Sequence, residues 1–217
     1  MSYYYYLVVS CGFQSRIGIF GGTFDPPHNG HLSAALFARE ELGLEIVLMT
    51  VANEPWQKTM ATHSSSLKEK NTLTSAKDRF EMLRAALGPY EKLEADDCEI
   101  KRGGLTYTTD TLTEVKNRFP ESELILLLGA DVANNLETWK KPDEVFEHSK
   151  VVVMTRPGVD HLDLPHGRKF EILHVPSVDV SGSQIRECLI AGESVNKMLP
   201  ESVLKYIRAE NLYQEKI

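Results

Sequence analysis

The chain has few cysteines and no long apolar run, and each of these absences excludes some classes of protein. Cys11, Cys98 and Cys188 are odd in number, far apart and form no C-x-x-C pair. This spacing indicates neither a disulfide framework nor a structural zinc site, so we expect a reducing, cytoplasmic environment. No apolar run approaches the roughly 18 residues that a membrane-spanning helix requires, and we expect no membrane partner.

An excess of basic charge is also missing. The 217 residues include 24 Lys and Arg against 31 Asp and Glu, which gives a net charge of -7. This balance argues against a protein that coats nucleic acid, so we expect no nucleic-acid partner. With 42% hydrophobic residues the chain can form a real core, and its length fits one ordinary α/β domain.

The first residues are rich in tyrosine, with four in a row at Tyr3–Tyr6. They lack the charged n-region that precedes the apolar stretch of a signal peptide. We therefore expect residues 1–15 to be a disordered extension and residues 16–217 to form a single domain.

Short apolar runs alternate with segments of helical periodicity along the rest of the chain. Strands are expected at residues 17–20, 45–51, 93–100, 123–129, 150–155 and 170–175. Helices are expected at residues 30–42, 75–87, 108–119, 142–148, 183–191 and 200–211. The alternation predicts an α/β fold with a doubly wound parallel sheet, helices on both faces, and a ligand site at the carboxyl ends of the strands.

The segment after the first predicted strand reads Gly21-Gly22-Thr23-Phe24-Asp25-Pro26-Pro27-His28-Asn29-Gly30-His31. It has neither the G-x-G-x-x-G pattern nor a P-loop. Its glycines let the backbone approach a ligand, and a helix N-terminus binds phosphate. His28 and His31 point to the same side of the helix start. The residues alone favour phosphate contact and leave open a metal site that includes Asp25, or structural hydrogen bonding.

A second segment, Val180-Ser181-Gly182-Ser183-Gln184-Ile185-Arg186, opens a helix near the C-terminus. Ser181 or Ser183 can cap this helix, and Arg186 lies one turn in, where a guanidinium could bind phosphate. Taken alone, the segment favours a plain capped helix with a surface arginine over an anion site.

Together these two segments resemble the nucleotidyltransferase signatures G-x-F-D-P-x-H-x-G-H and S-[ST/G]-x-x-I-R. Within that superfamily the chain resembles the bacterial nicotinate mononucleotide adenylyltransferases from about residue 16 to residue 213. Further matching pieces, in order, are residues 54–58, 76–83, 102–112, 129–131, 138–139, 156–158 and 199–213.

The resemblance implies a Rossmann-like nucleotidyltransferase fold and a reaction in NAD biosynthesis. The phosphate of nicotinate mononucleotide attacks the α-phosphorus of ATP, pyrophosphate leaves, and deamido-NAD forms. Since the attacking group is already an anion, the enzyme must align two polyanions and neutralise charge on the leaving group. Mg²⁺ is expected to be carried by the ATP phosphates, with no metal ligand from the protein.

The resemblance also implies roles for particular residues. The catalytic groups would be His28, His31, Lys58 and Arg186, with His31 near the α-phosphate and Lys58 closing over the phosphates from the 53–74 loop. ATP would bind to Gly21, Gly22, Thr23, Phe24, Asp131, Arg156, Ser181 and Ser183. The pyridine nucleotide would bind to Tyr107, Thr108 and Trp139, with the indole stacked on the pyridine ring.

Some alternatives stay open at this point. The piece Glu54-Pro55-Trp56-Gln57-Lys58 departs from the Pro-Pro-His-Lys form common in the family, which leaves the roles of Trp56 and Lys58 open. Without the resemblance, Trp139 would be read as a packing residue. The acceptor could instead be nicotinamide mononucleotide or phosphopantetheine, and a nucleotide-binding regulator is the alternative outside enzymes. A homo-oligomer is compatible with the sequence.

Overall fold

The computed structural model describes residues 14–54, 73–155, 162 and 164–214. Most of the predicted extension, most of the 53–74 loop and the turn at residues 156–158 therefore lie outside the described residues.

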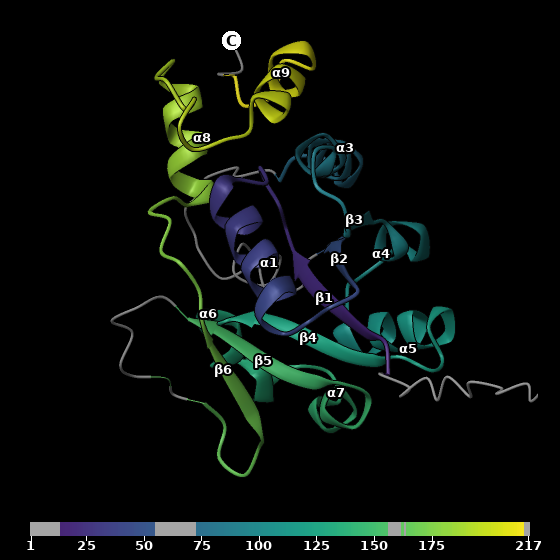
Figure 1. Ribbon diagram of the computed structural model, residues 1–217. Helices are drawn as coiled ribbons and strands as arrows, with labels where there is room; N and C mark the ends of the chain where they lie inside the picture. The colour runs from purple at the N-terminus through teal and green to yellow at the C-terminus, as the bar shows by residue number, and fades with distance from the viewer. Residues whose placement is uncertain (1–13, 55–72, 156–161, 163, 215–217) are drawn as a thin grey trace, which may run out of the picture.

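A six-stranded parallel sheet forms the centre of the described chain, in the order β3-β2-β1-β4-β5-β6 (Figure 1). The strands are β1 (Arg16–Gly22), β2 (Ile46–Val51), β3 (Leu93–Asp96), β4 (Glu123–Gly129), β5 (Lys150–Thr155) and β6 (Phe170–His174). The order reverses direction between β1 and β4, so the crevice at their carboxyl ends is the place where such sheets bind ligands. The predicted doubly wound sheet is confirmed.

Helices cover both faces because the buried strands are apolar on both sides. On one face, α1 (Asn29–Glu41), α3 (Ala76–Leu87), α8 (Gly182–Ile190) and α9 (Glu201–Ala209) pack over alternate residues such as Ile125 and Leu127. On the other, α5 (Thr108–Arg118), α6 (Ala130–Ala133), the 3₁₀ turn η1 (Leu136–Thr138) and α7 (Pro142–His148) pack over Leu124 and Leu126. In Figure 1, α8 and α9 stand beside each other above α1.

One expectation about secondary structure is wrong. Residues 93–100 do not form one strand, because β3 ends at Asp96 and a short helix, α4 (Cys98–Arg102), follows. The Asp96 carboxylate accepts a 3.1 Å bond from the Cys98 amide and so turns the chain into this helix. After β4 the chain forms two short elements, α6 and η1, for which the sequence analysis gave no prediction.

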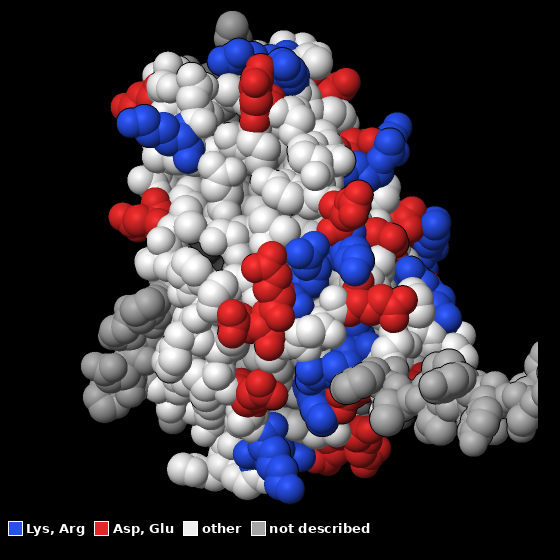
Figure 2. All heavy atoms as spheres, viewed as in Figure 1, with Lys and Arg blue, Asp and Glu red and all other residues white. Residues whose placement is uncertain are grey.

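The surface carries both signs of charge. On the face in Figure 2, acidic and basic side chains are interspersed over the lower right of the molecule. Among the helices of the described ranges, none combines the length and the apolar character that a bilayer crossing demands.

Candidate active site

A cavity of about 810 Å³ opens at the carboxyl ends of β1 and β4. Its walls come from the segment after β1, the starts of α5, α6 and α8, and the chain between η1 and α7. The predicted residues that line it are Gly21, Gly22, Thr23, Phe24, His28, His31, Tyr107, Thr108, Asp131, Trp139, Ser181, Ser183 and Arg186. Lys58 and Arg156, like Trp56, lie outside the described residues.

The turn after β1 is held in an uncommon backbone conformation. Phe24 has a φ of 51°, in the left-handed region, although its side chain is almost fully buried. Its ring fills the space beside Gly22, where an added Cβ would lie only 2.7 Å from it. Gly21 has no such neighbour and lines the cavity. One glycine therefore makes room for the core, and the other leaves the backbone open to a ligand.

The two histidines lie face to face at the N-terminus of α1. Their ring centroids are 3.6 Å apart with an interplanar angle of 21°. The backbone N–H of His28 donates to Nδ1 of His31 at 3.2 Å, and Phe24 packs against the His31 ring edge to face. Since Nδ1 of His31 accepts a hydrogen bond, the neutral ring carries its proton on Nε2. His31 is thereby a donor for an anion, at a helix end that already favours one.

The second motif brings Arg186 to the same place. The Ser181 hydroxyl accepts a 3.2 Å bond from the Gln184 amide, so Ser181, not Ser183, caps α8. Arg186 donates through Nη1 to the main-chain oxygen of Asp25 at 2.7 Å and through Nη2 to the Ser183 hydroxyl at 3.2 Å. Arg186 is therefore not a simple surface arginine, because it joins α8 to the turn after β1.

Asp25 makes structural hydrogen bonds. Its side chain accepts a 2.5 Å bond from the Tyr213 hydroxyl and a 3.4 Å bond from the Thr74 amide. Among the described residues, no group of three or more His, Cys, Asp or Glu side chains is arranged to hold a metal ion.

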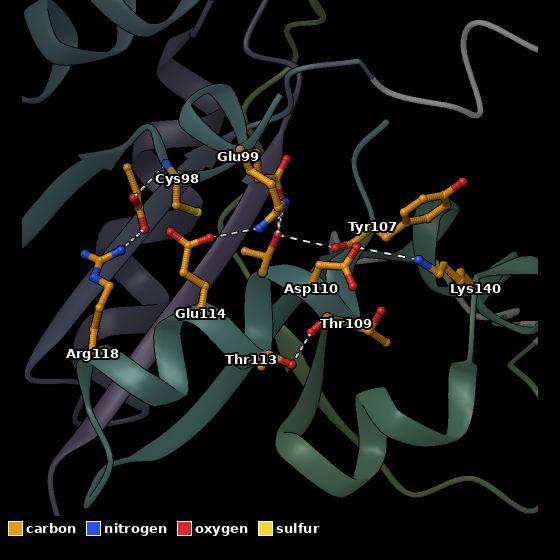
Figure 3. Close-up of polar contacts among 12 residues, drawn as sticks. Cys98, Glu99, Tyr107, Thr109, Asp110, Thr113, Glu114, Arg118 and Lys140 are labelled. Carbon is orange, nitrogen blue, oxygen red and sulfur yellow. Dashed lines mark hydrogen bonds and ion pairs between the residues drawn. The ribbon is translucent and has the colours of Figure 1, made fainter. Parts of the chain in front are cut away.

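The far end of the cavity is formed by Tyr107, Thr108 and Trp139. Helix α5 begins at Thr108, and Trp139 packs partly against the core on that face of the sheet. Lys140, which sequence reasoning missed, lines the cavity here with Nζ 4.2 Å from the centre of the Tyr107 ring and 3.7 Å from Asp110 Oδ2 (Figure 3). Its position next to Trp139 in the sequence was the available signal.

Glu99 is a second cavity residue that sequence reasoning missed. It is 5% exposed, and its carboxylate accepts a 2.6 Å bond from the Thr111 hydroxyl on α5. Burial raises the pKa of Glu99 to about 7, against the opposing effects of hydrogen bonds from Thr111 and Thr106 and of the Arg102 charge. A carboxyl group that titrates near neutrality therefore lies behind the start of α5.

Arg79 is buried beneath the turn after β1. It is 1% exposed, and it donates hydrogen bonds of 2.7–3.0 Å to four main-chain oxygens, those of Thr23, Ala52, Asn53 and Thr74. Burial lowers its pKa, partly offset by the charge of Asp25. The signal in the sequence was its spacing from Met82 and Leu83, which places Arg79 on the buried face of α3. Arg79 thus joins the turn after β1, through Thr23, to the two ends of the 53–74 loop.

Family comparison supports the class that the fold and motifs define. The model of the cytidylyltransferase-like family matches residues 19–188. The chain belongs to that family of nucleotidyltransferases.

Curated relatives place the chain in a more specific group within this family. A protein of Saccharopolyspora erythraea is 34% identical over 93% of this chain and 91% of its own length. A protein of Exiguobacterium sibiricum is 35% identical over 91% of this chain and 98% of its own length. A protein of Rubrobacter xylanophilus is 37% identical over 92% of this chain and 92% of its own length. All three bear the name "Probable nicotinate-nucleotide adenylyltransferase". The chain is thus a member of the nicotinate-nucleotide adenylyltransferases, and the resemblance found in its sequence is confirmed.

Solved structures confirm the fold. The nicotinic acid mononucleotide adenylyltransferase of Plasmodium falciparum, in complex with APC, aligns with a TM-score of 0.69 and 18% identity. The alignment covers 92% of this chain and 98% of that protein, and the complex of the same enzyme with NaAD gives the same values.

Proposed function

We propose that this enzyme transfers the adenylyl group of MgATP to nicotinate mononucleotide and releases pyrophosphate and deamido-NAD. The observation that supports this most directly is the shared cavity. One end of the cavity holds the histidine pair and Arg186, which suit phosphates, and the other end is aromatic and cationic, which suits a pyridine carboxylate. The curated relatives of the chain carry the corresponding activity in their names.

At the phosphate end, His31 donates through Nε2 to the α-phosphate, and His28 lies near the β- and γ-phosphates. The N-terminus of α1 adds its positive dipole. Arg186 neutralises charge that develops on the leaving pyrophosphate. The attacking phosphate needs no base, so these groups act by alignment and charge stabilisation. Lys58 is proposed to assist from outside the described residues, and Arg156 to contact ATP.

Mg²⁺ enters as part of the substrate MgATP. It commonly binds through substrate phosphates and waters rather than through a protein cage. Asp25, Glu99 and Asp131 line the cavity, but among the described residues no group of three or more His, Cys, Asp or Glu side chains is arranged to hold a metal ion. We therefore assign no protein ligand to it.

At the other end, Trp139 stacks on the pyridine ring, while Tyr107, Thr108 and the N-terminus of α5 meet the carboxylate. Asp131, exposed at the start of α6, accepts hydrogen bonds from a ribose, and Gly21, Gly22, Thr23, Ser181 and Ser183 line the ATP side. A negative carboxylate suits a helix N-terminus and the nearby Lys140 better than a neutral carboxamide does. The cytoplasmic location and the oligomeric state stay predictions.

Release of pyrophosphate from MgATP tests the proposal, with nicotinate mononucleotide, nicotinamide mononucleotide and phosphopantetheine compared as acceptors. We expect the highest kcat/KM with nicotinate mononucleotide. A higher value with either other acceptor would assign a different substrate, and MgATP binding without turnover would assign a regulator.

A further inference from the structure

The hydroxyl of Tyr213 lies within hydrogen-bond distance of the turn after β1, although 188 residues separate it from Asp25 in the sequence. Tyr213 does not line the cavity, whereas Asp25 does. We propose that Tyr213 is a positioning residue of this enzyme: it holds the Asp25 side chain, and through Asp25 it sets the geometry of the turn that meets the ATP phosphates. The inference rests on the proposed function.

Three segments that are distant in sequence meet at Asp25. Its Oδ1 accepts from the Tyr213 hydroxyl at 2.5 Å, its Oδ2 from the Thr74 amide at 3.4 Å, and its main-chain oxygen from Arg186 at 2.7 Å. Asp25 is 5% exposed, and a hydrogen bond to a buried carboxylate is among the stronger ones in proteins. A substitution of Tyr213 should therefore alter the position of Asp25 in the turn and, through the main-chain oxygen of Asp25, the position of the Arg186 guanidinium.

The backbone near Tyr213 is shaped to make this contact. Asn211 and Tyr213 both have left-handed φ angles, of 52° and 57°, and the Leu212 amide donates to Ile207 in α9 at 3.0 Å. Residues other than glycine keep such a conformation when their surroundings hold them in it. The Tyr213 side chain is partly buried against the core, and in Figure 1 the described chain ends between α8 and α9.

The phenol is suited to act as a permanent donor. Burial, followed by the charge of Asp25 and the hydrogen bond to it, raises the pKa of Tyr213. The hydroxyl therefore keeps its proton through the neutral range and donates to Asp25 at any pH at which the enzyme would be assayed.

Tyr206 provides a matched control within the same part of the chain. Its hydroxyl donates to Asp78 Oδ1 at 3.0 Å and joins α9 to α3, and neither residue lines the cavity. Tyr206→Phe and Tyr213→Phe each remove one hydroxyl that bonds to an aspartate and keep the ring. A purely structural role for Tyr213 predicts the same behaviour for both variants.

The experiment measures thermal melting, MgATP affinity by calorimetry without an acceptor, and steady-state kinetics for wild type and both variants. We expect both variants to fold and to lose similar thermal stability. Tyr213→Phe is expected to weaken MgATP binding and to lower kcat/KM for MgATP by about 10-fold, with the KM of the pyridine nucleotide changed by less than about two-fold. Tyr206→Phe should keep wild-type affinity and kinetics.

A double-mutant cycle with Asp25→Asn tests whether Tyr213 acts through Asp25. We expect the two substitutions to be strongly non-additive in MgATP affinity. Unchanged MgATP affinity in Tyr213→Phe, equal losses of MgATP affinity in both tyrosine variants, or additive effects in the cycle would each overturn the inference. Because calorimetry requires no acceptor, wild-type protein that binds MgATP but does not use nicotinate mononucleotide would refute the proposed function alone.

Discussion

The two ends of the cavity, to which we assigned the phosphates and the pyridine ring under the proposed function, are built in different ways. At the phosphate end, Arg79, Arg186 and Tyr213 donate to main-chain or buried carboxylate oxygens around the turn after β1. At the pyridine end, Glu99 is buried behind the cavity wall, but the charged side chains beside Tyr107, Lys140 and Asp110, are both more than 40% exposed and form a 3.7 Å ion pair. Buried hydrogen bonds fix positions, whereas exposed charges act through a field that water and salt weaken. We therefore expect the phosphate end to control turnover and the pyridine end to control substrate choice.

The largest effect should come from His31→Ala. Loss of one preorganised donor at the phosphates is expected to lower kcat by on the order of 10²-fold. Steady-state pyrophosphate release measures this, with His148→Ala, an exposed histidine on α7, as the control. Near-normal turnover of His31→Ala would contradict the expectation that the phosphate end controls turnover.

Glu99 predicts a pH dependence of stability at the pyridine end. Because burial raises the pKa of Glu99 to about 7 from 4.5, the folded protein keeps a proton that the unfolded chain releases between these values. The free energy of unfolding should therefore fall as the pH rises from 5 to 8, with a contribution from Glu99 on the order of 2 kcal/mol.

Urea unfolding of wild type and Glu99→Gln at pH 5 and pH 8 measures that contribution. The glutamine variant should lose less stability over this range. The control is Glu114→Gln, since Glu114 pairs with Arg102 nearby but is 40% exposed. Equal pH dependence in wild type and Glu99→Gln would show that the Glu99 carboxyl titrates normally.

Trp139→Ala separates substrate stacking from packing. We expect the KM of nicotinate mononucleotide to rise by about 10-fold, because the pyridine ring loses its aromatic partner, while the KM of MgATP stays near the wild-type value. Phe146→Ala is the control, because Phe146 also packs on this core cluster but does not line the cavity. A larger change in the KM of MgATP would place Trp139 outside the pyridine site.

The contrast between the two ends of the cavity also explains which parts of the structure could be predicted well from the sequence. The phosphate end comes from two contiguous motifs, one that joins an apolar run to a helix start and one that opens a helix, so local patterns were sufficient to predict the strands, the helices and the ligand edge. The side chains elsewhere in the chain that hydrogen-bond to these motifs could not be predicted from local patterns. Tyr213 reaches Asp25 only because α9 packs on α3, and that contact depends on tertiary packing.

The pyridine end was predicted less completely for a physical reason. Its elements are short: α4 has five residues, α6 four and η1 three, too few for a hydrophobic period to appear. Residues 93–100 therefore read as a strand, and Glu99 was not singled out as a cavity residue. Tyr107, Thr108 and Trp139 came from the resemblance, and their positions in one wall support that prediction without testing their roles.

The smallest effect should come from Lys140, and it is the sharpest test of how the pyridine end works. Lys140→Gln removes a cation beside Tyr107, so kcat/KM with nicotinate mononucleotide should fall by about three-fold at low salt, with less effect at 0.15 M salt. The value with nicotinamide mononucleotide should not change, because its ring carries no carboxylate. Lys141→Gln is the control, since Lys141 pairs with Glu144 at 2.7 Å and does not line the cavity. Equal losses with both acceptors would mean that Lys140 supports the fold of this wall and does not select the carboxylate.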